Sequence, residues 1–98
     1  MPKADALTHA VSHALSTVAS TIGLSWAVKG RLFRQMARAI RAQAYRNPTP
    51  EDFAVWAGEE LADLLSDEDI RPLCRLALAE WFAAELLNWL TGDFDDAA

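Results

Sequence analysis

The 98 residues comprise 52% hydrophobic and 23% charged side chains, a balance that is typical of one globular domain and excludes a disordered chain. The formal net charge of −5 excludes a surface that attracts polyanions over the whole molecule. A single cysteine cannot close an internal disulfide, and no continuous apolar N-terminal stretch predicts a signal peptide, so a cytoplasmic location is expected. The most apolar stretch, 76–90, contains Glu80 and Glu85 and is too short to span a bilayer, so no membrane partner is expected.

The first predicted helix covers residues 4–22. Its apolar residues recur at steps of three and four and so share one face, and Gly23 is a natural stop after them. The opposite face carries His9, His13 and several serines but almost no charge, so we expect it to be partly covered. The apolar face comprises Leu7, Ala10, Val11, Ala14, Leu15, Val18 and Ile22.

The second predicted helix covers residues 26–45, with Ser25 as a suitable N-cap. One side of this helix is basic, and the other side is apolar. Two prolines in the segment 47–50 then require a turn, because proline lacks an amide donor and restricts the residue before it. The apolar side comprises Leu32, Phe33, Met36 and Ile40.

Two further helices are predicted after this turn. Thr49 as N-cap and Pro50 at the first helical position indicate a helix over 50–65. A fourth helix over 71–91 ends at Gly92, and the acidic tail, 93–98, should fray. Because the fourth helix is apolar on nearly every side, we expect it to be either the central element or the face of a homodimer. The expected fold is all-α, a compact bundle of about four helices in a single domain.

Four arginines follow one stripe of the second predicted helix, and Tyr45 continues the same line. Like charges at these spacings repel each other, so the stripe favours a negative partner. Three negative partners fit the stripe: an acidic protein surface, nucleic-acid phosphate, or the carboxylates of the third helix. Pairing with the third helix would be internal to the chain and would have no role in function. The stripe comprises Arg31, Arg34, Arg38 and Arg41, and the third-helix carboxylates are Glu59, Glu60 and Asp63.

The segment 19–25 is similar to the turn of a helix-turn-helix DNA-binding motif, with a small residue, a glycine four positions later, and then an aliphatic and a capping residue. Two features depart from that motif, since Lys29 stands where a buried aliphatic is usual and Gly30 lies inside the recognition helix. A helix-glycine-helix corner also arises in any bundle, because glycine is favoured just after a helix end. DNA binding is therefore the alternative hypothesis.

No group of residues predicts catalysis, a cofactor or a metal. His9 and His13 lie four residues apart, but two ligands do not make a site, and no third group orients either imidazole as a base. Cys74 lies near two arginines, which can activate a thiol, although its apolar neighbours favour a buried and inert side chain. We therefore expect a protein that is not an enzyme.

Four tryptophans are many for a chain of this length, and a small bundle cannot bury all of them fully. The candidate interface residues are Trp26 and Trp89, with His9 and His13 of the weakly charged face. The first hypothesis is a small regulator or inhibitor, of the kind that mobile elements also encode, which forms homodimers and docks on a larger cytoplasmic protein. The alternative is a DNA-binding transcriptional regulator that uses a degenerate helix-turn-helix and the arginine stripe.

Overall fold

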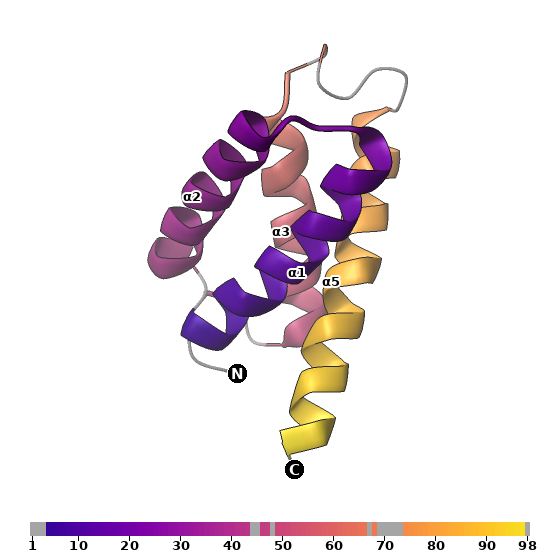
Figure 1. The fold of residues 1–98 in the computed structure, drawn as a ribbon. Coiled ribbons are helices and arrows are strands. Elements are labelled where there is room, and N and C mark those ends of the chain that lie inside the picture. The colour runs from indigo at the N-terminus through magenta and orange to yellow at the C-terminus, as the bar shows by residue number, and fades with distance from the viewer. Residues whose placement is uncertain (1–3, 44–45, 48, 67, 69–73, 98) are drawn as a thin grey trace.

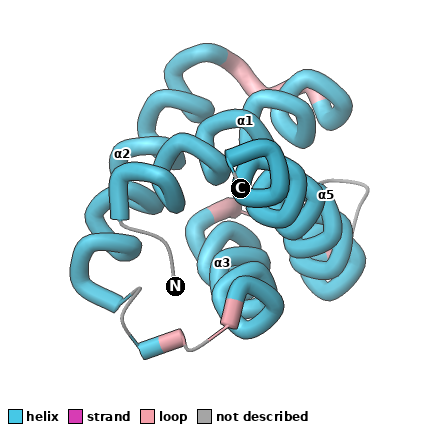
Figure 2. The backbone as a smooth tube through the Cα atoms, turned by 90° about the horizontal axis from the view of Figure 1, so that it is seen from below, coloured by secondary structure: helices cyan, strands magenta, loops and turns pink. Residues whose placement is uncertain are grey.

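The computed structural model describes residues 4–43, 46–47, 49–66, 68 and 74–97. Most of these residues form four α-helices, α1 (Ala4–Ile22), α2 (Trp26–Gln43), α3 (Pro50–Leu64) and α5 (Arg75–Ala97). Successive helices run in opposite directions (Figure 1). Each helix packs on the next and α1 also packs on α5, so the four helices form a closed ring when viewed along the bundle (Figure 2). This arrangement confirms the predicted all-α bundle.

Gly23 sets the turn between α1 and α2, and the hydroxyl caps Ser25 and Thr49 set the starts of α2 and α3. Gly23 adopts a φ of 77°, which glycine enters without steric cost, and the Leu24 amide donates to the Ala19 carbonyl at 3.0 Å. The hydroxyls of Ser25 and Thr49 each accept the amide three residues later, at 3.3 and 3.1 Å. Both predicted N-caps are therefore confirmed.

The ends of α2 and α3 differ slightly from their predicted positions. The last residue of α2 is Gln43, and Tyr45 lies outside the described residues. α3 ends at Leu64, one residue early, because Leu65 has an extended backbone with φ −90° and ψ 139°.

The start of α5 is later than predicted as well. Cys74, which we expected inside the first turns, is the N-cap instead, and its Sγ accepts the amide of Ala77 at 3.3 Å. The first helical residue is therefore Arg75 and not a residue near position 71. Residues 69–73 lie outside the described part of the chain.

The predicted stop at Gly92 is wrong, since α5 continues through it to Ala97, and the acidic tail 93–98 is helical as far as it is described. A glycine inside a helix costs about 1 kcal/mol relative to alanine but keeps its amide donor, which proline would lack. The hydroxyl of Thr91 also donates to the carbonyl of Leu87 at 2.9 Å, within the helix.

Each helix contributes one stripe of fully buried apolar side chains to the core. No polar side chain is buried among the described residues. In α1 and α2 the buried stripes follow the predicted apolar faces, although Ile22 and Phe33 are only partly buried. The core stripes are Leu7, Val11, Leu15 and Val18 of α1, Leu32, Met36 and Ile40 of α2, Phe53, Ala57 and Leu61 of α3, and Leu78, Phe82, Leu86 and Leu90 of α5.

The expectation that α5 is the central element is wrong. α5 occupies one corner of the ring and packs on α3 and α1 (Figure 2). Because only two neighbours cover it, Trp81 and Leu87 are half-buried and Leu76 is 69% exposed. The other expectation, that α5 is the face of a homodimer, stays a prediction.

The most extensive helix contact, between α3 and α5, depends on a close approach at Gly58. Gly58 is buried, and a Cβ placed on it would collide with the carbonyl oxygen of Ala79 and lie 3.1 Å from its carbonyl carbon. The obstacle is helix backbone, which a side-chain rotation cannot remove. Position 58 therefore requires glycine if the two helices are to keep their spacing.

Arg75 joins the start of α5 to the end of α3. Its Nη1 donates to the carbonyls of Ala62 and Leu65, the latter at 2.8 Å. Carbonyls in the last turn of a helix have no partner within that helix, and a cation there also interacts favourably with the helix dipole. The guanidinium therefore caps α3 from the neighbouring helix.

We expect Gly58→Ala to lower the free energy of unfolding by about 1 to 3 kcal/mol, the usual cost of overpacking a filled contact. The matched control is Gly30→Ala, because a Cβ on Gly30 would meet only Arg34 Nη1, at 3.4 Å. Alanine is the better helix former, so this control should gain up to about 1 kcal/mol. Urea unfolding of both variants measures the difference, and an equal effect at the two positions would contradict the close approach.

We expect Arg75→Gln to lower the free energy of unfolding by about 1.5 to 3 kcal/mol, since charge-assisted hydrogen bonds to the α3 carbonyls are lost. Arg34→Gln removes the same charge from an exposed position and should change stability by less than about 0.5 kcal/mol. Thermal and urea unfolding provide the comparison. Equal stability of the two variants would show that Arg75 does not cap α3.

Candidate interaction surfaces

The outer face of α2 carries the predicted arginine stripe, which we call the Arg face (Arg31, Arg34, Arg38 and Arg41). All four side chains are exposed, on the side of the helix opposite its buried stripe. Within the part of the chain that the structure describes, no carboxylate pairs with Arg34, Arg38 or Arg41. Of the three partners considered for the stripe, the carboxylates of α3 are therefore ruled out for these three arginines, which lie opposite the buried stripe of α2.

Beside the Arg face, a shallow hollow of about 200 Å³ lies between α1 and α2. Trp26 at its edge is 84% exposed, and the Lys29 ammonium lies 4.7 Å from the centroid of the indole. This contact is a cation–π interaction, which leaves one face of a large apolar side chain to solvent. The hollow is lined by Ser12, Leu15, Trp26, Lys29, Gly30 and Phe33.

The predicted interface residues His9, His13 and Trp89 form a cluster between α1 and α5. The His13 ring stacks on the Trp89 ring at 4.3 Å and an angle of 15°, and it meets the His9 ring edge-on at 4.5 Å. The two imidazole Nε2 atoms lie 3.0 Å apart, within hydrogen-bonding distance. Trp89 and His13 are half-buried, so this part of the weakly charged α1 face is covered within the chain, by α5.

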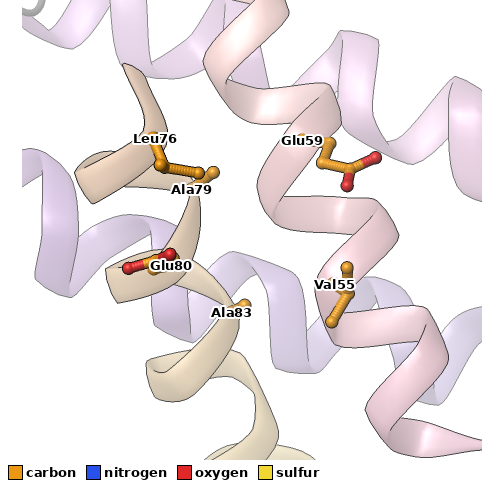
Figure 3. Close-up of a pocket in the computed structure, with 6 residues that line it drawn as sticks. All are labelled: Val55, Glu59, Leu76, Ala79, Glu80 and Ala83. Atoms are coloured by element: carbon orange, nitrogen blue, oxygen red, sulfur yellow. The ribbon is translucent and has the colours of Figure 1, made fainter. Parts of the chain in front are cut away.

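A groove of about 330 Å³ lies between α3 and α5 (Figure 3), and nothing in the sequence singled it out. Val55 on α3 and Leu76 on α5 are 56% and 69% exposed at its sides. Its floor is made of the small residues Ala79 and Ala83 of α5. We call it the α3–α5 groove, and it is apolar inside.

Two carboxylates give the α3–α5 groove its charge. Glu59 lines it from α3 and Glu80 from α5, and both are exposed. Figure 3 shows the two carboxylates at the outer sides of the groove, away from each other. A ligand that enters the groove therefore meets apolar walls first and negative charge at the edges.

The remaining candidates are not brought together into a site. The structure exposes Cys74, contrary to the expectation of a buried thiol, because its capping position places it at the surface. In the described residues, no three histidine, cysteine or acidic side chains could hold one metal ion. The corner of residues 19–25 is a helix-glycine-helix turn, which a bundle and a DNA-binding motif share.

None of the described helices is both long and apolar enough to cross a membrane. No protein-family model matches the sequence, and comparisons with curated proteins and with solved structures found no match. The function must therefore be inferred from the surfaces themselves.

The stacked pair His13–Trp89 gives a prediction for the α1–α5 contact. In a double-mutant cycle with His13→Ala and Trp89→Ala, we expect a coupling of about 0.5 to 1.5 kcal/mol in the free energy of unfolding, as for other stacked rings. The control cycle pairs His13→Ala with Trp26→Ala, because the ring contacts of His13 are with His9 and Trp89, and these two substitutions should be additive. Additivity in both cycles would show that the stacking contributes nothing to stability.

Proposed function

We propose that this chain is a non-enzymatic protein–protein interaction module that docks on an acidic surface of a larger protein through the Arg face. The proposal depends on Arg34, Arg38 and Arg41, which are exposed in one line and have no carboxylate partner in the described chain. Like charges on successive turns repel each other, and carboxylates of a partner would relieve this repulsion through bidentate hydrogen bonds.

The distribution of charge favours a protein partner over duplex DNA. The formal net charge is −5, and α3, which follows α2 in the ring, exposes Asp52 and Asp63. Phosphates that extend beyond the Arg face would meet these carboxylates, whereas an acidic patch of limited size on a protein would not. Opposite charges on the two partners would also accelerate their association.

A module of this size would act by occupying the surface of its partner, as a regulator or an inhibitor. We place it in the cytoplasm, where the exposed thiol of Cys74 would stay reduced.

A DNA-binding regulator is the second candidate. The observation in its favour is the position of the Arg face, on the helix that directly follows the helix-glycine-helix corner. A recognition helix in that position reads the major groove, while its arginines contact phosphates or base edges.

A pair of double variants with equal net charge tests both candidates. Arg34→Gln with Arg38→Gln removes two charges from the Arg face, while Thr17→Glu with Asn88→Asp adds two negative charges at exposed positions on α1 and α5. Immobilised wild-type protein and both variants are incubated with nuclease-treated lysate of the source organism. Retained proteins are quantified by mass spectrometry at increasing salt, and binding to random duplex DNA is measured by fluorescence anisotropy.

We expect one acidic protein to bind the wild type and the α1/α5 variant, and to bind the Arg-face variant at least tenfold less, a loss of about 1.4 kcal/mol or more. Binding should also weaken as salt rises. Salt-sensitive binding to DNA that is lost in the Arg-face variant would replace this proposal with the second candidate. If the two variants retain the acidic protein equally and the wild type does not bind DNA, both candidate functions are contradicted.

A further inference from the structure

An occupant that complements the α3–α5 groove is apolar at its centre and positively charged at its edge. Exposed apolar side chains next to a hollow lose contact with water when a complementary surface covers them, which favours association. The groove is lined by Val55, Leu76 and two alanines, while Glu59 and Glu80 stand at its sides. A purely acidic or purely polar occupant would not complement this lining.

This chain itself carries a surface with the required chemistry. Trp26 is the most exposed large apolar side chain among the described residues, and the Lys29 ammonium lies 4.7 Å from its ring. We propose that the α3–α5 groove of one copy binds Trp26 and Lys29 of a second copy. The indole enters the apolar groove, and the ammonium approaches the carboxylate of Glu59 or Glu80.

Each of the two surfaces combines a hollow with an exposed apolar side chain. The groove has an exposed side chain beside it, Leu76, and the α1–α2 hollow has Trp26 at its edge. When the indole of one copy enters the groove of the other, Leu76 can enter the hollow beside Trp26, where Leu15 and Phe33 provide apolar walls. Each copy therefore contributes one large side chain and one hollow to the same contact.

The position of the two surfaces determines the type of assembly. In the ring, the α1–α2 pair lies opposite the α3–α5 pair (Figure 2). One copy therefore cannot fill its own groove, and the contact joins two different surfaces. Such head-to-tail contacts form rings or open chains of copies and do not stop at a two-fold dimer.

The first variants each remove one of the two surfaces. Trp26→Ala removes the indole, and Val55→Lys with Leu76→Lys places two positive charges in the groove. Both positions are exposed, so these substitutions should leave the fold intact. Circular dichroism and urea unfolding check the fold of both variants.

Sedimentation velocity and light scattering then give the mass of the full chain, with a reductant present, from about 10 μM to about 1 mM, the range in which small interfaces dissociate. We expect the mass of the wild type to rise with concentration and to fall again with added salt. Both variants should keep the mass of one chain. An equal mixture of the two variants should give a complex of two chains and no larger species, because each variant retains the surface that the other lacks.

The Arg-face variant, Arg34→Gln with Arg38→Gln, should associate with other copies like the wild type. A failure of this inference can therefore be distinguished from a failure of the proposed function. A wild type that keeps the mass of one chain up to the highest concentration overturns the inference. Association that survives either surface variant, or a mixture that stays at the mass of one chain, overturns it as well.

Discussion

The close approach of α3 and α5 at Gly58 is the constraint on which the other features of the bundle depend. The backbone of Ala79 lies where the side chain of any other residue at position 58 would stand. Because the two helices are this close, small side chains suffice to fill the space between them, and Ala79 and Ala83 form the floor of the groove. Val55 and Leu76 remain outside the contact and exposed. One glycine thus allows both the tightest core contact and the apolar surface next to it.

Charge is separated between neighbouring elements and not mixed over the surface. The charged residues of α2 are all basic, and those of α3 are all acidic. In many bundles such helices would pair along their shared edge, but the Arg face lies opposite the buried stripe of α2 and is exposed to solvent. An exposed pair would contribute little stability in any case, about 0 to 1 kcal/mol. The charges of Arg34, Arg38 and Arg41 are therefore available for contacts outside the chain, and leaving them unpaired forgoes little stability.

The sequence predicts those parts of the structure that depend on local signals. Gly23, Ser25 and Thr49 mark a helix end and two helix starts because each acts on amides or carbonyls a few residues away. Two of the missed features, the Arg75 cap and the α3–α5 groove, depend on distant partners. Arg75 caps carbonyls 10 and 13 residues earlier, and the groove exists only because a particular flank of α3 meets α5. The start of α5 was missed because cysteine is not among the usual capping residues.

No residue of the Arg face lines either surface through which we propose that copies associate, and only Arg34 borders the α1–α2 hollow. Copies joined head to tail would therefore display one Arg face each, repeated along the assembly. A partner with several acidic patches would bind its first Arg face in an encounter between separate molecules. Each further Arg face would then bind within the complex that is already formed. Such linked binding events raise the overall affinity by a factor on the order of 10² to 10⁴ without any new contact. The strength of docking would then depend on the abundance of the protein in the cell, because abundance sets the number of linked faces.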